Sequence, residues 1–140
     1  MIDSVPDSFD WMMVKKFTEC LQHFYYATLR ISGSLYMTAN RHFHEICKLH
    51  LILSSMIDSD DFEVRDMGLK MKLKFDKYWG DPDKMNKIIF FANVFDPSSK
   101  LEVIQFSFQT MFGHDKGVEL FNSVVNELTL LFDEYQSLYA

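Results

Sequence analysis

Four side chains that commonly bind metals lie close together in the sequence: His42, His44, Cys47 and His50. On a helix of about 3.6 residues per turn, Cys47 and His50 lie roughly 60° apart and could share a ligand, whereas His42 and His44 diverge from them. A structural zinc site needs four convergent donors, and the sequence has no CxxC or HxxxH motif. We therefore interpret Cys47 and His50 as packing residues and predict neither a metal site nor a cofactor.

Aspartates are the other candidates for chemistry. One cluster contains Asp58, Asp60 and Asp61, and a second contains Asp76, Asp81 and Asp83. Asp96 stands alone. Such clusters can bind divalent cations, but helix caps and solvated turns use the same residues. Asp60 and Glu63 have the spacing of a capping box, and the Asp96-Pro97 pair is typical of a helix start. We therefore interpret the aspartates as caps.

The remaining catalytic patterns are absent from the sequence. It has no glycine-rich phosphate loop, and no nucleophile-elbow pattern surrounds Ser98-Ser99. Lysines alternate with aromatic residues from Lys72 to Trp79, which is conceivable for nucleic-acid stacking but more typical of a helix with one aromatic face in the core. The sequence therefore predicts no catalytic, cofactor-binding or metal-binding residue, no small-molecule substrate and no enzyme.

Composition favours one all-α domain over residues 1–140, a bundle of about six helices. The chain is 48% apolar, with 14 Phe and 9 Met, and only 3 Pro and 5 Gly interrupt it. The net charge of −6 disfavours a free-standing nucleic-acid binder. The two cysteines lie inside apolar helical patterns, which favours an intracellular protein. No signal peptide or membrane-spanning run is visible, so we expect no membrane partner.

Apolar residues at three- and four-residue steps predict the helices. The first begins at Asp7 or Ser8 and ends at Ser32-Gly33-Ser34. The second has an inward stripe from Phe43 to Ile57, with Glu45 on the outer side. The third ends at Trp79, where Gly80 suits a left-handed cap, and Asp81-Pro82 restarts the chain.

The central stretch from Met85 to Phe106 is expected to organise the rest. Residues Ile88 to Phe95 are almost all apolar and should be buried on nearly all sides. Two helices with a capped corner at Asp96-Pro97 are predicted here, and a buried strand remains the alternative for Ile88 to Phe95. The last helix has near-heptad apolar spacing up to Tyr135, which suits either dimerisation or packing within the domain.

Two segments, Phe24 to His50 and Met67 to Phe106, together resemble plant hAT-type transposases and their domesticated relatives of the RICESLEEPER and DAYSLEEPER type. The residues that match the family pattern are Lys77-Tyr78-Trp79, Met85-Asn86, Asp96-Pro97 and Lys100-Leu101. The chain departs from the pattern at Phe95, where the family usually has Leu, and at Ser98, where it usually has Arg. The second change removes a bidentate hydrogen-bond donor from the corner.

The resemblance implies an internal helical region inserted into an RNase-H-like catalytic core, without the BED zinc finger, the catalytic carboxylates or the C-terminal dimerisation segment of the full-length relatives. The expected function is that of a non-catalytic structural fragment of a nuclear, transposase-derived protein, with DNA as a partner in the full-length context. Two alternatives stay open: a module that self-associates as a homodimer through its last helix, and a weak DNA-binding module.

Overall fold

The computed structural model describes residues 5–32, 39–98 and 100–140, and within these ranges the chain is helical with no strand. The prediction of an all-α fold of about six helices is therefore confirmed, and the strand alternative for Ile88 to Phe95 is wrong. The elements are α1 (Ser8–Ser32), α2 (Ala39–Ile57), α3 (Phe62–Trp79), the 3₁₀ helix η1 (Pro82–Lys84), α4 (Lys87–Phe95), α5 (Leu101–Phe112) and α6 (His114–Tyr139).

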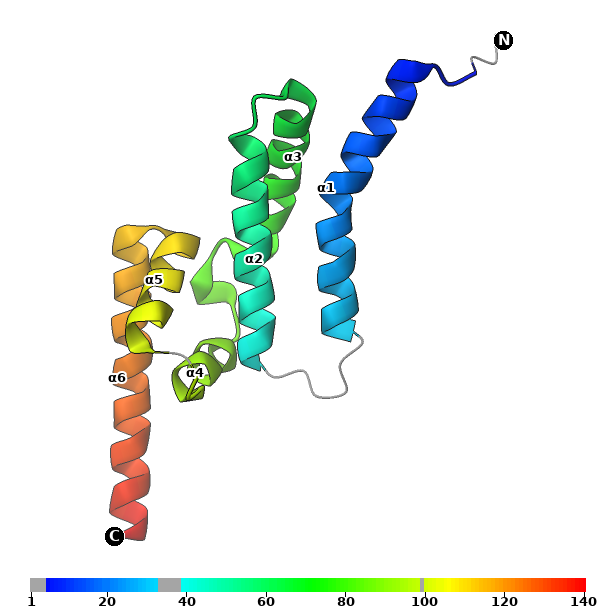
Figure 1. The fold of residues 1–140 in the computed structure, drawn as a ribbon. Coiled ribbons are helices and arrows are strands. Elements are labelled where there is room, and N and C mark those ends of the chain that lie inside the picture. Colours follow the sequence, from blue (N-terminus) through cyan, green and yellow to red (C-terminus); the bar gives the residue numbers. More distant parts are fainter. Residues whose placement is uncertain (1–4, 33–38, 99) are drawn as a thin grey trace.

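Helix α2 is the centre of the arrangement, because it contacts α1, α3, α4 and α5 (Figure 1). Helices α2 and α3 form an antiparallel hairpin, and Gly68 of α3 packs closely against Met56 of α2. A Cβ atom at that position would lie 2.8 Å from the Cβ of Met56, so the glycine allows a close helix crossing. Helix α1 packs against both α2 and α3, and α5 and α6 form a second antiparallel pair.

The core is built around three fully buried aromatic rings from three helices. Phe43 of α2, Phe90 of α4 and Phe108 of α5 meet edge to face, with ring centroids 5.3–5.7 Å apart. Edge-to-face contact is the favoured geometry for aromatic pairs. These rings join the two helical hairpins into one body.

The central segment is less buried than the sequence predicts. In α4, Phe90 and Asn93 are buried, but Ile88 and Phe95 are 62% and 71% exposed. A nine-residue helix at the end of a bundle presents only one side to its neighbours, so its other apolar side remains open. Buried Asn93 avoids an unsatisfied amide by donating to the Ile89 carbonyl at 2.8 Å.

Several caps differ from the predicted ones. Helix α1 does begin after Asp7, whose carboxylate accepts from the Asp10 amide in a reciprocal box. Helix α3, however, is capped by Asp61 and not by Asp60, since the Asp61 carboxylate accepts from the Glu63 amide at 3.1 Å. Gly80 ends α3 at φ −79°, so the predicted left-handed cap is wrong there. Asp81 caps η1 as expected.

The Asp96 corner is a turn and not a helix start. The Asp96 carboxylate accepts from the backbone amide and the hydroxyl of Ser98, which closes a local turn. Ser99 lies outside the described residues, and α5 begins at Leu101 behind Lys100, which makes no side-chain cap. The prediction that Asp96-Pro97 starts the next helix is therefore wrong by about one turn.

Helices α5 and α6 are joined at Gly113, whose φ of +92° favours glycine. Their close contact depends on a second glycine, because a Cβ at Gly117 would lie 2.5 Å from the Gln109 backbone. Val124 of α6 is buried against the core. The C-terminal part of α6 continues beyond the other helices (Figure 1) and is exposed from Thr129 onward.

Candidate functional site

Among the metal-binding side chain types on α2, His44 and Cys47 line one pocket, whereas His42 and His50 contact different aromatic rings. The His42 ring contacts Trp79 edge-on at 5.4 Å, and the His50 ring lies 6.0 Å from that of Phe75. Burial, with a smaller contribution from Lys72, lowers the pKa of His50, and burial raises the pKa of Cys47 to about 12. Within the described ranges, no group of three His, Cys, Asp or Glu side chains could hold a metal ion.

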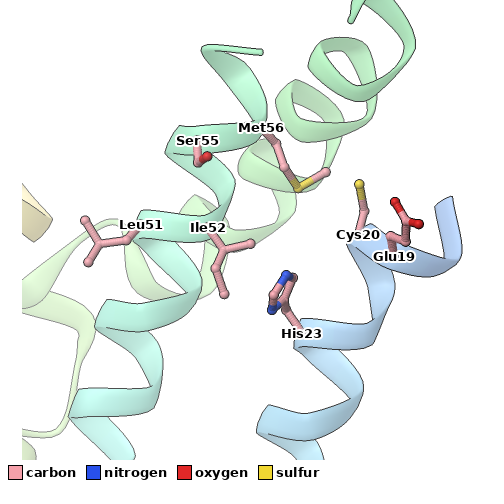
Figure 2. Close-up of a pocket in the computed structure, with 7 residues that line it drawn as sticks. All are labelled: Glu19, Cys20, His23, Leu51, Ile52, Ser55 and Met56. Atoms are coloured by element: carbon pink, nitrogen blue, oxygen red, sulfur yellow. The ribbon is translucent and has the colours of Figure 1, made fainter. Parts of the chain in front are cut away.

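A pocket of about 380 Å³ lies between α1 and α2 (Figure 2). Cys20 and His23 of α1 face Ile52 and Met56 of α2 across it, so a thiol and an imidazole share one apolar recess. Burial first, and then the negative charges of nearby Glu19 and Asp61, raise the pKa of the Cys20 thiol. Because the thiolate is the nucleophile, this pair lacks the activation that Cys–His catalysis needs. Their i, i+3 spacing is the signal in the sequence that indicates the pairing.

Helix α1 is joined to α2 by a buried carboxylate. Arg30 donates two parallel hydrogen bonds of 2.8 Å to Glu45, and Lys48 lies 3.5 Å from the same group. Glu45 is only 6% exposed, so its predicted position on the outer side of α2 is wrong. The hydrogen bonds from Arg30 are the main reason that the pKa of Glu45 is lowered. The Glu45 carboxylate is therefore already paired with Arg30, and this pair holds α1 against α2.

The aspartate clusters also make structural contacts. Asp61 caps α3 and pairs with Lys16 of α1 at 2.6 Å, and these hydrogen bonds lower its pKa to about 2. Asp83 pairs with Lys116 of α6 at 3.2 Å, and Asp76 pairs with Lys72. The carboxylates are spread over separate helix ends and ion pairs, and they are not gathered around a common point.

The lysine- and aromatic-rich surface of α3 is partly neutralised. Lys70 and Lys72 pair with Asp66 and Asp76, one turn away on the same helix. Tyr78 is 64% exposed, with the Lys77 amine 5.8 Å from its ring centroid. This face offers scattered cations and no continuous basic groove.

An apolar groove is formed by the end of α4, the start of α5 and the C-terminal part of α6. We call it the α6 groove. Its volume is about 510 Å³, and its lining is almost entirely apolar: Val94, Phe95, Leu101, Val125, Leu128, Thr129, Leu131, Phe132 and Tyr135. Phe95, Phe132 and Tyr135 are each more than half exposed. A surface of this kind is typical of an interaction site.

Comparison with known proteins places the chain in a family. The pattern of the family described as "hAT-like transposase, RNase-H fold" matches residues 40–135, from α2 into α6. The chain is 30% identical over 135 residues to "Zinc finger BED domain-containing protein RICESLEEPER 1" of Oryza sativa subsp. japonica. It is 31% identical over 133 residues to "Zinc finger BED domain-containing protein DAYSLEEPER" of Arabidopsis thaliana, and 28% identical over 133 residues to "Putative AC transposase" of Zea mays.

These alignments cover 94–95% of the chain but only 16–18% of the relatives, so the chain spans less than a fifth of their length. The chain belongs to the hAT-like transposase family, as its sequence motifs indicate. No solved structure matches it significantly. None of the described helices is both long and apolar enough to cross a membrane.

Proposed function

We propose that this chain is a non-catalytic helical domain of a transposase-derived protein, folding as one unit over residues 1–140. One observation supports the absence of catalysis most directly: the candidate carboxylates with side-chain partners in the structure act in caps, turns and ion pairs. Two-metal phosphoryl chemistry needs carboxylates gathered around one substrate phosphate. Described residues of this chain provide no such group.

In the full-length context, the domain would support a catalytic core and contribute protein contacts, with DNA bound by the whole protein in the nucleus. The names of the relatives support this context, because they are called zinc finger BED domain-containing proteins and putative AC transposases. The net charge of −6 supports DNA contact mainly by other parts of the whole protein.

A nicking assay tests the proposal. Purified chain is incubated with supercoiled plasmid and Mg²⁺ or Mn²⁺, and we expect no conversion to the open circular form. Nicking that disappears in an Asp58→Asn/Asp60→Asn variant, but persists in an Asp3→Asn control, would show that the chain carries its own reaction centre.

Self-association through α6 is the second candidate function, because the α6 groove leaves Phe132 and Tyr135 exposed. Sedimentation velocity over a range of concentrations tests it. A dimer that Phe132→Asp dissociates, with helicity unchanged, would establish this alternative over a purely structural role. A salt-dependent shift of duplex DNA in the same samples would instead indicate the weak DNA-binding module.

A further inference from the structure

The apolar face of α6 is wider than a simple dimer seam requires. Written as a heptad, Val125, Leu128, Phe132 and Tyr135 occupy the a and d positions, and Leu131 and Leu138 add the neighbouring g position. An apolar face of three heptad positions is typical of a helix in a bundle, whereas a two-stranded coiled coil uses two. Leu138 is 68% exposed and Phe132 is 66% exposed, so this face lacks a covering helix among the described residues.

The groove already has two of the walls that a further helix would need. The ends of α4 and α5 supply Phe95 and Leu101 on one side, and α6 supplies Leu131 and Phe132 on the other. A side chain from an added helix would therefore be enclosed between two walls. This is the arrangement of a helix-in-groove site, in which apolar anchors fill a preformed hollow.

The charges around the groove specify the partner. From Val118 to Ala140, the chain has no Lys or Arg, but it has Glu119, Glu127, Asp133 and Glu134. At about 3.6 residues per turn, Glu127 and Glu134 fall at one edge of the apolar face, and Asp133 lies on the opposite side of the helix. Glu127 is paired with Lys87 of α4 at 2.5 Å, whereas the Asp133 and Glu134 carboxylates have no partner in the described part of the chain.

We propose that the α6 groove binds an amphipathic helix that carries Lys and Arg along one flank of its apolar face. This inference rests on the proposed function as a non-catalytic contact domain and names the chemistry of its partner. A second copy fits poorly, since two α6 helices would bring their acidic edges together.

Two synthetic peptides of about three heptads test the proposal. They share one Leu-rich apolar face and differ only in their flanks, which carry Lys in one peptide and Glu in the other. Fluorescence anisotropy with the full chain should show binding of the Lys-flanked peptide at least about tenfold tighter at about 50 mM salt, with the difference shrinking at about 500 mM salt.

Two matched variants distinguish binding in the α6 groove from nonspecific attraction of a basic peptide to an acidic protein. Phe132→Asp and Leu130→Asp add the same charge at residues of nearly equal exposure, 66% and 69%, but Leu130 falls on the side of α6 away from the groove. Phe132→Asp should weaken binding of the Lys-flanked peptide by at least about tenfold, and Leu130→Asp should leave it within about twofold. Circular dichroism would check that both variants remain helical.

Three results would overturn the proposal: equal affinity for the two peptides, equal effects of the two variants, or a concentration-dependent dimer that Phe132→Asp dissociates. Each is independent of the nicking assay. A chain that nicks DNA through its own carboxylates would remove the proposed function while leaving the peptide result intact, so the two failures are distinguishable.

Discussion

Helix α1 and the aromatic core are held by different kinds of interaction. Phe43, Phe90 and Phe108 come from three helices and are almost completely removed from solvent. Among the described side chains of α1, only that of Ala27 is as fully buried, and the helix is anchored by the pairs Arg30–Glu45 and Lys16–Asp61. One region thus depends on apolar burial, and the other depends largely on charge.

This difference has a consequence for stability. Apolar burial is insensitive to pH and is not weakened by salt, whereas ion pairs are lost when their carboxylates are protonated, and partly exposed pairs such as Lys16–Asp61 are also screened by salt. We therefore expect α1 to detach under conditions that leave the core folded. The largest mutational effects should come from the core, and the largest solvent effects from α1.

The strongest expected effect comes from deleting a core ring. Phe108→Ala removes a fully buried side chain and should lower the free energy of unfolding by about 4 kcal/mol. Phe106→Ala makes the same chemical change two residues away on α5, where the ring is 68% exposed, and should cost less than about 0.5 kcal/mol. Urea denaturation measures both, and similar losses would contradict the assigned core.

A smaller loss is expected at the contact between α5 and α6. Alanine is favoured over glycine inside a helix by about 1 kcal/mol, so a net loss from Gly→Ala must come from steric conflict. Gly117→Ala places its Cβ 2.5 Å from the Gln109 backbone and should destabilise by about 2 kcal/mol.

Gly68→Ala is the comparison, because its Cβ meets the Cβ of Met56 at 2.8 Å and should cost about 1 kcal/mol. Thermal unfolding followed by circular dichroism ranks the two variants. A stabilised Gly117→Ala variant would mean that the two helices are farther apart than the structure shows.

The sequence was sufficient to predict the helices because apolar periodicity reflects burial directly. The stripe through Phe43, Ile46 and Leu53 does face the core. The same periodicity gave the wrong position for Glu45. It cannot reveal that Arg30, fifteen residues earlier in the chain, pairs with this carboxylate between α1 and α2. Long-range pairing of this kind depends on how the helices are placed, which local spacing does not determine.

The α6 groove shows a second limit. The heptad spacing through Phe132 and Tyr135 is visible in the sequence, but it does not distinguish an internal packing face from an open one. Only the lengths and placement of α4 and α5 leave the end of α6 uncovered (Figure 1). The same reasoning explains Ile88 and Phe95, whose apolar character predicts burial, although a short helix at the bundle end leaves them exposed.

The smallest expected effect is local and tests the charge-dependent attachment of α1. Glu45→Gln removes the charge that Arg30 binds, so α1 amides should exchange with deuterium about tenfold faster, which corresponds to about 1.4 kcal/mol. Amides of α5 should be unchanged. Glu19→Gln is the matched control, because Glu19 is exposed on α1 and forms no ion pair within the described residues.

Acid should reproduce the effect of Glu45→Gln in the unaltered chain. The pKa of Glu45 is lowered in the folded state by its hydrogen bonds from Arg30, so its stabilising contribution is complete above the ordinary glutamate range. That contribution is lost as pH falls through the lowered pKa, and the contact of Asp61 with Lys16 is lost near the Asp61 pKa of about 2.

Exchange of α1 amides, corrected for intrinsic rates, should therefore rise below about pH 4 in the unaltered chain. In Glu45→Gln, it should already be fast at neutral pH and should change little until Asp61 titrates. An α1 that stays protected in acid would mean that apolar contacts, and not charge, hold it to α2.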